Sequence, residues 1–241
     1  MSRDLDWDGC FNVRDLGGIE TVDGASIRRG AAVRADSLHK LSADGWGALV
    51  RHGVRTVIDL RNEFECRPDV APRPDEVTTL HLPLDGFDDR EFWDPIVAGP
   101  QFGTPIYYRG HLQRMPERSA AVLSAFARAR PGGVAFHCVG GRDRSGQITI
   151  LLLALAGVGT DAIVADYELS DERLKPMWRA NGGPDEAEVN ERFLAERGTT
   201  AGALIASLLQ SLDIERTLVA AGLTHADLRA LRARLLEGQY L

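Results

Sequence analysis

The residues best suited to chemistry lie in one loop in the second half of the chain. The segment from His137 to Gly146 runs H-C-V-G-G-R-D-R-S-G, with a short apolar run before it and an apolar helical run after it. A loop that closes onto a helix N-terminus points several backbone N–H groups into one concavity, with the positive end of the helix dipole behind them. That field favours the thiolate of Cys138 over its thiol, and Arg144 can donate two parallel N–H bonds to a phosphoryl group. The loop therefore predicts nucleophilic attack on phosphorus.

The alternative for Cys138 is a buried apolar role, which is usual for a cysteine at the end of a strand. The joint spacing of Cys138, Arg144 and Ser145 between a strand and a helix favours the reactive interpretation. Cys10 and Cys66 have no comparable neighbours and are interpreted as incidental. Three cysteines without C-x-x-C spacing exclude a disulfide scaffold and a cysteine-rich zinc site. We expect no metal and no cofactor.

A strand and a helix must hold this loop, and the flanking sequence predicts both, over Val134–His137 and Gln147–Leu155. Upstream, strands alternate with helices, which is typical of a parallel sheet with ligands at the carboxyl ends of its strands. We predict an α/β fold, with a mainly parallel central sheet flanked by helices and a helical C-terminal part. The other predicted elements are a hairpin over Ile19–Val22 and Ala25–Arg28, strands over Arg55–Arg61 and Thr78–Leu82, a helix capped by Ser42, and helices over residues 106–130 (broken near Pro116), 161–169, 186–197, 203–212, 214–221 and 225–236.

Composition limits the class of protein. The chain has 241 residues, 44% of them hydrophobic and 26% charged, and with no linker-like stretch it predicts one domain over residues 1–241. A net charge of −7 argues against a nucleic-acid partner held through phosphate contacts. The longest apolar run is too short to cross a bilayer, and the first residues lack the pattern of a secretory signal. We expect a cytoplasmic protein, with export that needs no cleavable signal as the alternative. The oligomeric state is left open.

The loop resembles that of the bacterial protein-tyrosine phosphatases whose loop usually reads H-C-x-x-G-K-D-R-T-G, the tyrosine phosphatase 3-like family within the cysteine-dependent superfamily. Phe11–Gly18 is similar to that family's N-F-R-D-L-G-G element, and Val57–Arg61 with Glu65 is similar to its D-L-R-x-x-x-E element. Asp166–Ser170 resembles its D-Y-x-L-[ST] helix, and Ala221–Leu223 resembles its C-terminal part. The resemblance implies the fold of these phosphatases and hydrolysis of phosphate monoesters. Protein phosphotyrosine is the favoured substrate, with phosphoserine, phosphothreonine and phosphoinositides as alternatives and inorganic phosphate as the product.

The implied reaction passes through a phosphocysteine intermediate. Cys138 attacks phosphorus, Arg144 stabilises the charge on the phosphoryl oxygens, and Ser145 donates a hydrogen bond to the departing sulfur. His137 is expected to brace the loop by hydrogen bonding rather than to carry protons. The phosphate itself is expected to bind to the loop residues Val139, Gly140, Gly141, Arg142, Asp143 and Arg144.

Two aspartates compete for the role of general acid. Asp85 follows the predicted strand Thr78–Leu82, at the edge of the sheet where the loop lies, and members of the superfamily commonly supply an Asp from a separate loop. Asp143 lies inside the phosphate loop, where an ionised carboxylate would repel a phosphate dianion. It must then be protonated or turned outward toward an arginine. We favour Asp85.

Further positions follow from the same resemblance. Arg14, Asp15 and Arg61 are assigned supporting roles, with purely architectural ion pairs as the alternative. Asp166 and Tyr167 are interpreted as packing residues. Arg142 and Ser145 stand where the family usually has Lys and Thr. These exchanges keep the charge and the hydroxyl but can alter substrate preference.

The role of residues 171–205 and the function of the whole chain each have alternative interpretations. Residues 171–205, and Met177–Thr200 in particular, form either a lid beside the site, by analogy with related enzymes, or a surface helical excursion. The chain itself could instead be a non-catalytic phosphate-binding module or a rhodanese-type sulfurtransferase. The retained Cys138, Arg144 and Ser145 argue against the first, and the arginine six residues after the cysteine argues against the second.

Overall fold

A five-stranded sheet in the order β1-β2-β5-β3-β4 forms the centre of the computed structural model, which describes residues 2–237. β1 pairs antiparallel with β2, and the remaining pairs are parallel. The predicted α/β fold with a mainly parallel sheet is therefore confirmed. The strands are β1 (Arg14–Asp15), β2 (Ala32–Ala35), β3 (Val54–Asp59), β4 (Thr78–His81) and β5 (Gly133–His137).

The strand register brings four carboxyl ends to one edge of the sheet. His137 at the end of β5 lies opposite Ala35 of β2 on one side and Asp59 of β3 on the other. Asp59 in turn lies opposite His81 of β4. The residues that follow these four strands therefore meet at a single edge, where parallel α/β sheets bind their ligands.

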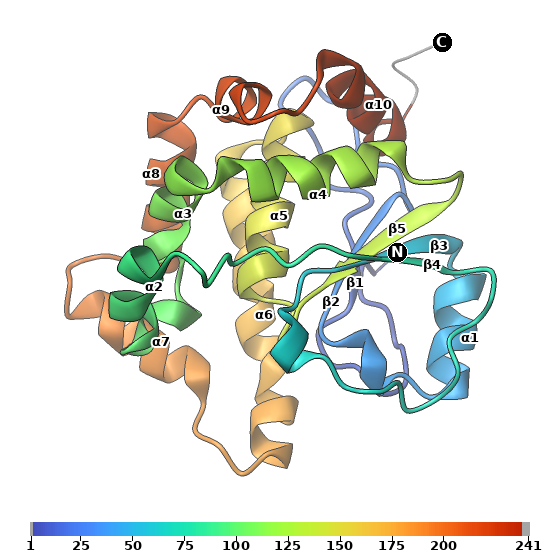
Figure 1. Ribbon diagram of the computed structural model, residues 1–241, viewed down its shortest axis with the longest axis horizontal. Helices are drawn as coiled ribbons and strands as arrows, with labels where there is room; N and C mark the ends of the chain where they lie inside the picture. Colours follow the sequence, from blue (N-terminus) through green and yellow to red (C-terminus); the bar gives the residue numbers. More distant parts are fainter. Residues whose placement is uncertain (1, 238–241) are drawn as a thin grey trace.

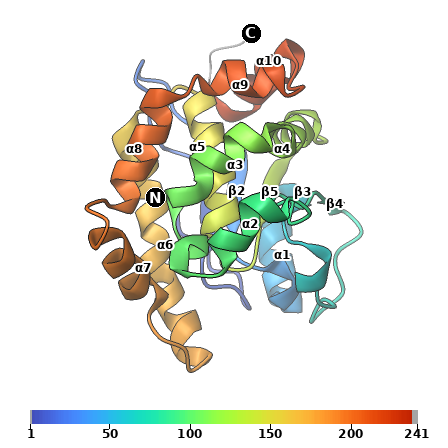
Figure 2. The same ribbon diagram turned by 60° about the vertical axis from the view of Figure 1, so that its left-hand side comes forward.

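Helices cover both faces of the sheet (Figures 1 and 2). α1 lies alone on one side, and α4, α5 and α6 lie on the other. The helices are α1 (Ala43–Arg51), α2 (Arg90–Val97), α3 (Tyr108–Arg114), α4 (Pro116–Arg128), α5 (Asp143–Leu155), α6 (Thr160–Ala180), α7 (Glu186–Ala195), α8 (Ala201–Ser211), α9 (Ile214–Ala220) and α10 (His225–Leu235). Short 3-10 turns add η1 (Leu38–Lys40), η2 (Glu63–Glu65), η3 (Pro100–Gly103) and η4 (Pro105–Tyr107). Within the described residues, no helix is both long and apolar enough to span a membrane.

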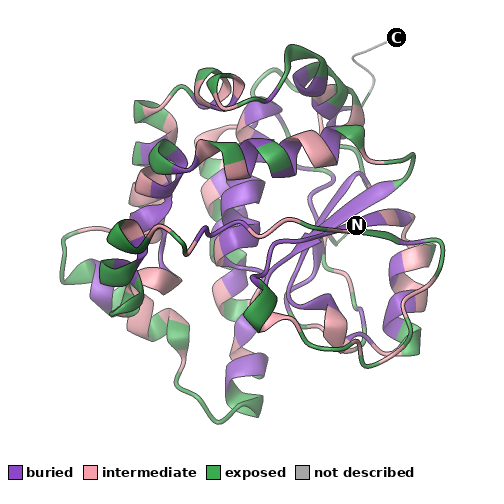
Figure 3. Ribbon diagram, in the orientation of Figure 1, coloured by how far each residue is buried: buried purple, intermediate pink, exposed green. Residues whose placement is uncertain are grey.

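Two hydrophobic clusters, one on each face, follow from the alternation of side chains along the strands. Val33, Val57 and Ala135 pack with Trp46 of α1 in the smaller cluster. Their neighbours on the same strands, such as Ile58 and Phe136, join the larger cluster around α5. Figure 3 shows α5 buried along most of its length, in agreement with the run Ile148–Leu155, which is apolar except for Thr149.

Several local predictions are confirmed. Ser42 caps α1 by accepting the N–H of Gly45 at 3.2 Å, and the predicted helix over 106–130 is divided at Pro116 into α3 and α4. The end of the helix predicted over 161–169 is wrong, because α6 runs on to Ala180. Its later apolar side chains, Leu174 and Trp178, are buried in a small cluster of their own, so packing extends the helix through a polar stretch.

Candidate active site

The loop between β5 and α5 occupies the centre of the carboxyl edge of the sheet. β5 ends at His137 and α5 begins at Asp143, so Cys138 to Arg142 form the turn between them. Gly141 has a φ of 69°, and a Cβ there would lie 2.6 Å from the carbonyl atoms of Ala35. The loop passes so close to the end of β2 that only glycine fits.

The carbonyl groups of this loop are held from behind. Val139 accepts from the backbone N–H of Ser37 at 3.1 Å, and Gly140 accepts from the side chain of Asn12 at 2.9 Å. Gly141 accepts from Arg34 at 2.8 Å. Within residues 2–237, the backbone N–H groups of 139–142 donate to no protein acceptor. The loop therefore keeps these donors free on its other side, together with the unpaired N–H groups of the first turn of α5, as an anion-binding concavity requires.

A buried ion cluster fixes the side chains that hold these carbonyls. Asp166 of α6 pairs with Arg34 at 2.8 Å, with Arg14 at 3.1 Å and with Arg3 at 2.7 Å. The three guanidinium groups hold the pKa of Asp166 far below its usual value, although burial opposes this. Burial and the charge of Arg34 lower the pKa of Arg14 to about 9. The interpretation of Asp166 as a packing residue is wrong, because it is the charged centre behind the loop.

Arg14 and Asp15 have separate roles, since successive side chains of a strand point to opposite faces. Arg14 donates to Asn12 Oδ1 at 2.5 Å and thereby orients the amide that binds Gly140. Asp15 instead accepts from the backbone N–H of Gly30 at 2.8 Å and pairs with His52 at 3.0 Å. The assignment of Asp15 to the site is corrected, because these partners lie toward the amino ends of β2 and β3.

Cys138 and Arg144 lie close together at the base of the loop. Cys138 is 2% exposed, and it is one of the groups, with Glu65 and Asp85, whose interaction with Arg144 raises the pKa of that guanidinium although burial opposes this. Both terminal nitrogens of Arg144 bond to the carboxylate of Glu65, one of them at 2.7 Å, and Nη1 lies 3.2 Å from Asp85 Oδ2. Glu65 is a site neighbour that the sequence interpretation does not assign, although it ends the D-L-R-x-x-x-E pattern.

Asp85 is buried beside Arg144 at the end of the β4 segment. It is 2% exposed, and its Oδ2 accepts from Asn62 Nδ2 at 2.8 Å. Burial raises the pKa of Asp85 to about 6, helped by the nearby charges of Glu65 and Asp143 and opposed by Arg144 and Asn62. A carboxyl group that changes protonation near neutral pH suits proton transfer.

Asp143 faces a different environment. It is the first residue of α5, and its Oδ1 lies 3.5 Å from the hydroxyl of Tyr108 and 3.6 Å from Arg142 Nε. The side chain thus points toward Tyr108 and Arg142, which is the outward orientation considered from the sequence.

His137 and Arg61 brace the ends of the central strands. His137 is fully buried, donates from Nδ1 to the carbonyl of Cys138 at 3.2 Å, and has its pKa lowered to about 4 by burial. Arg61 binds Asp59 through two nitrogens and donates to Ser37 Oγ at 2.9 Å. These contacts join β3 to the segment after β2, on either side of the loop.

The hydroxyl of Ser145 lies against the end of β2. It donates to the carbonyl of Ala35 at 3.5 Å, which is well beyond the usual length of an O–H···O hydrogen bond and makes this contact weak. Ser145 is fully buried in the first turn of α5, directly after Arg144.

The side chain of Arg142 contacts residues outside the loop. It is 3% exposed, donates to the carbonyl of Gly103 at 2.6 Å and bonds to Asp171 at 3.3 Å. Its guanidinium also lies 5.9 Å from the centre of the Trp178 ring. Both terminal nitrogens of Arg142 are therefore engaged by Asp171 and Gly103, so the predicted binding of phosphate by Arg142 is assigned to its backbone N–H.

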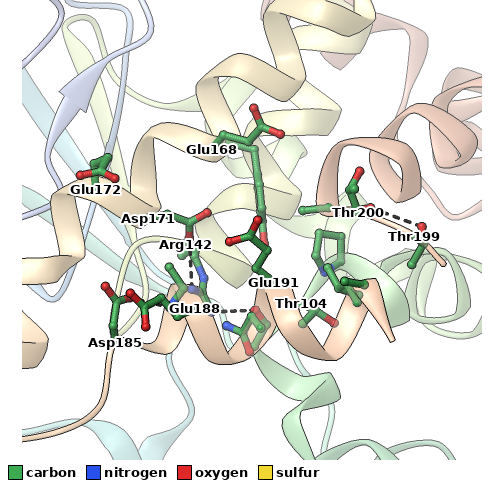
Figure 4. A pocket seen from close by; sticks show the side chains of 18 of the residues that line it. Thr104, Arg142, Glu168, Asp171, Glu172, Asp185, Glu188, Glu191, Thr199 and Thr200 are labelled. Atoms are coloured by element: carbon green, nitrogen blue, oxygen red, sulfur yellow. Dashed lines mark hydrogen bonds and ion pairs between the residues drawn. The ribbon is translucent and has the colours of Figure 1, made fainter. Parts of the chain in front are cut away.

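Arg142 forms one wall of a cavity of about 530 Å³ between α6, α7 and the η3–η4 segment (Figure 4). Lys175 is its other cationic side chain within the described residues. The acidic lining residues are Glu168, Asp171, Glu172, Asp185, Glu188 and Glu191. The cavity adjoins the phosphate loop through Arg142 and is strongly acidic.

Comparisons with known proteins place the chain among phosphatases. A family model described as the tyrosine phosphatase family matches residues 5–237. A tyrosine-protein phosphatase of Nostoc commune is 30% identical over 225 residues, covering 87% of this chain and 76% of that protein. A Cupriavidus necator protein provisionally named a tyrosine-protein phosphatase is 29% identical over 177 residues, which cover 71% of this chain and 64% of its own length. The match therefore spans less than two thirds of the Cupriavidus protein.

Two further matches are more distant. The triple specificity protein phosphatase PtpB of Mycobacterium tuberculosis is 27% identical over 201 residues, covering 71% of this chain and 70% of that protein. Among solved structures, a crystal structure of P. aeruginosa TpbA in complex with phosphotyrosine matches with a TM-score of 0.42 at 16% identity. It covers 82% of this chain and 89% of that one.

Proposed function

The chain belongs to the tyrosine phosphatase family. From this premise we propose that it is a protein-tyrosine phosphatase, which hydrolyses protein phosphotyrosine through a phosphocysteine on Cys138. One observation carries the proposal. Cys138, Arg144 and Asp85 converge beneath a loop whose backbone N–H groups are free while its carbonyls are held from behind. A nucleophile, a bidentate cation, an acid and an amide cradle are the parts that phosphoryl transfer needs.

The first step transfers the phosphoryl group to sulfur. The thiolate of Cys138 forms a bond to phosphorus while the bond from phosphorus to the tyrosine oxygen breaks. Asp85 gives its proton to that oxygen. Arg144 has five N–H groups, and Glu65 accepts one from each terminal nitrogen. Nη1 also faces Asp85, at 3.2 Å. The N–H on Nε and the second N–H on Nη2 are left to hold two phosphoryl oxygens as their charge increases.

The second step returns the enzyme to its starting state. A water oxygen bonds to phosphorus, its proton passes to the ionised Asp85, and the bond between sulfur and phosphorus breaks to release inorganic phosphate. We assign to Ser145 a hydrogen bond to the departing sulfur, for which its hydroxyl must turn from the carbonyl of Ala35. The long bond to that carbonyl, 3.5 Å, is a weak constraint on such a turn. His137, with its pKa lowered to about 4, stays neutral and braces the loop.

The acidic cavity next to Arg142 favours a phosphoprotein over a phosphoinositide. Six carboxylates against Arg142 and Lys175 repel a headgroup that carries several phosphates. They attract basic side chains that flank a phosphorylated tyrosine. Phosphoserine and phosphothreonine stay as alternative substrates, and the name of the tuberculosis relative, a triple specificity protein phosphatase, is compatible with a site that accepts more than one class of ester.

We also propose that residues 171–205 cover the site as a lid. Leu174 lies where a Cβ on Gly140 would touch it, 3.7 Å away, and Trp178 stacks over Arg142. The α6–α7 segment thus contacts the phosphate loop along one side. Hydrogen exchange in α7 that slows when vanadate binds would support a lid, and unchanged exchange would favour a surface excursion.

Release of phosphate from p-nitrophenyl phosphate tests the activity. We expect turnover by the wild type in EDTA, and loss of at least about 10⁴-fold for Cys138→Ser. This variant should keep measurable affinity for phosphate or vanadate, because the amide cradle and Arg144 remain.

Cys10→Ser is the matched control, since Cys10 bonds to the carbonyl of Ser37 and has no part in the proposed reaction. The turnover of this variant should equal that of the wild type. Retained turnover by Cys138→Ser would remove this cysteine from the mechanism. A wild type without phosphate release at mildly acidic to neutral pH would contradict the proposed function. A panel of phosphotyrosine and phosphoserine peptides and phosphoinositides, with Arg142→Lys, then ranks the substrates.

A further inference from the structure

The backbone that carries Asp85 is fixed by buried donors. The carbonyl of Asp85 accepts from Trp93 Nε1 at 2.8 Å and from His111 Nε2 at 3.2 Å. The preceding carbonyl, that of Leu84, accepts from the same His111 nitrogen at 3.1 Å. The N–H of Leu84 donates to the carbonyl of Leu60 just after β3, at 3.2 Å. Both sides of the peptide chain at Asp85 are therefore held.

The next residues close the turn tightly. Gly86 has a φ of 73°, and a Cβ there would lie 2.4 Å from Arg118 Nε. Arg118 itself donates to the carbonyl of Pro83 at 3.2 Å. A segment held at Pro83, Leu84 and Asp85 and turned at a glycine has little freedom to swing.

The proton position on His111 is set by a residue of α5. Gln147 Nε2 donates to His111 Nδ1 at 2.7 Å, so Nδ1 is the acceptor and Nε2 carries the hydrogen. His111 is 1% exposed, and burial lowers its pKa to about 4, so it remains neutral at assay pH. Gln147 lies three residues after Arg144 on the same helix. The contact thus ties the Asp85 segment to the helix that carries Arg144.

We propose that His111, oriented by Gln147, is a positioning residue that holds Asp85 in place for proton transfer before substrate arrives. This rests on the proposed function, in which Asp85 is the general acid. His111 bonds to the backbone of Asp85 and not to its carboxyl group. His111 therefore determines the position of Asp85 and does not bind its carboxyl group. The carboxyl group stays beside Arg144 without closure of a mobile loop.

The carboxyl group of Asp85 has its own set of charged neighbours. Arg144 of α5 and Glu65 of η2 face it most closely, Asp143 adds a negative charge from the start of α5, and the hydroxyl of Tyr107 lies nearby. None of these neighbours bonds to His111, so a change at His111 alters the position of the acid and leaves its charged partners intact.

The test separates positioning from folding by varying the leaving group. Phosphotyrosine needs a proton on its leaving oxygen, whereas 2,4-dinitrophenyl phosphate does not. For His111→Gln we expect kcat for phosphotyrosine to fall about 10- to 100-fold, while kcat for the dinitrophenyl ester changes less than about threefold. The decline of phosphotyrosine hydrolysis above about pH 6 should weaken in the same variant. Vanadate affinity should be unchanged.

A double variant shows whether His111 acts through Asp85. In an Asp85→Asn background, His111→Gln should cost less than about twofold further, since the acid is already absent. Gln147→Leu, which removes the donor to Nδ1, provides a second variant if His111→Gln fails to fold, and the same leaving-group pattern is expected. His52→Gln, at the amino end of β3, is the matched control and should resemble the wild type on both esters.

The possible results distinguish a failure of the role proposed for His111 from a failure of the proposed function. Equal losses on both esters, or a full further loss in the Asp85→Asn background, would show that His111 serves only structure and would overturn this proposal alone. If Asp85→Asn itself shows no leaving-group dependence, Asp85 is not the acid, and this part of the proposed function falls together with the role of His111. If Cys138→Ser keeps its turnover, the proposed mechanism is wrong, whatever the roles of Asp85 and His111.

Discussion

Two buried aspartates show how surroundings decide the role of a residue. Asp166 accepts from three arginines, and its pKa is far below the usual value for a carboxyl group. Asp85 lies near one arginine that Glu65 already neutralises, and its pKa is raised to about 6. Both carboxyl groups are buried, so their pKa values differ because Asp166 has three arginine partners whereas Asp85 shares its one arginine with Glu65. The first can only be a fixed charge, whereas the second can exchange a proton.

The protonation of Asp85 predicts how turnover depends on pH. For phosphotyrosine, kcat should decline as the pH rises above about 6, because the acid is then ionised. Asp85→Asn should lower kcat about 10² to 10³-fold and remove this decline. Steady-state rates from pH 4.5 to 8 measure both effects. A larger loss and a flat profile for Asp143→Asn instead would transfer the acid role to Asp143.

Sequence reasoning finds a reacting residue when its neighbours are close in the chain. Cys138 and Arg144 are identifiable because they stand only six positions apart, across the turn from β5 to α5. The pairing of Arg144 with Glu65 joins residues 79 positions apart, and no local pattern indicates that distance. The adjacency of Asp15 to Arg14 suggests a place at the site, but the pleat of β1 turns the Asp15 side chain toward His52.

The phosphate loop depends on a helix start, a strand end and a glycine that fits between them. Gly141 combines a positive φ with a contact against Ala35 that leaves no room for a side chain. Gly157, after α5, has a φ of 85°, and a Cβ there would meet no atom within 4 Å. Substitutions at these two glycines therefore distinguish the effect of backbone strain, which both share, from the effect of steric overlap, which only Gly141 has.

Gly141→Ala should therefore disable the site, whereas Gly157→Ala should not. Both substitutions place alanine at a positive φ, and this backbone strain should cost each variant about 1 kcal/mol of stability. Only Gly141→Ala also forces the loop from β2, so its kcat/KM for p-nitrophenyl phosphate should fall more than about 100-fold. Equal activities in the two variants would show that the loop tolerates displacement.

The sequence predicts a strand or a helix correctly where the apolar pattern of that element is complete within its own residues. The strand β5 and the buried helix α5 are apolar runs with clear limits, and the sequence predicts both. The strand β2 reads Ala-Val-Arg-Ala and escapes prediction, because Arg34 interrupts the apolar pattern. That arginine is buried only because Asp166 of α6 neutralises it. α2 escapes prediction as well, because its cap, Asp89, stands among four consecutive charged residues at 88–91 and is not recognisable there as the start of a helix.

For the whole molecule, the ion cluster around Asp166 joins the N-terminal segment to α6. Arg3, Arg14 and Arg34 come from three places in the first part of the chain, and all bond to one carboxylate. Removing that carboxylate would leave Arg14 and Arg34 buried without their counter-ion. Breaking a buried ion pair from one side is far more costly than breaking an exposed one.

Asp166→Asn should lower the free energy of unfolding at pH 7 by about 3 to 5 kcal/mol. The pKa of Asp166 is lower in the folded than in the unfolded protein, so the unfolded chain binds the proton first as the pH falls. Wild-type stability from this group is present above about pH 4 and is lost below it. Urea unfolding from pH 2.5 to 7 measures the effect. Asp94→Asn, which breaks the exposed pair with Arg90, should change little across this range.

The supports behind the phosphate loop come from distant parts of the chain. Asn12, Arg34 and Ser37 belong to the first sixth of the sequence, yet they secure carbonyls of residues 139–142. A nascent polypeptide that has already formed β5 and α5 would still lack a competent cradle until its own beginning has docked against them. Recovery of turnover after dilution from denaturant should thus report the last stage of refolding, later than the return of helical circular dichroism.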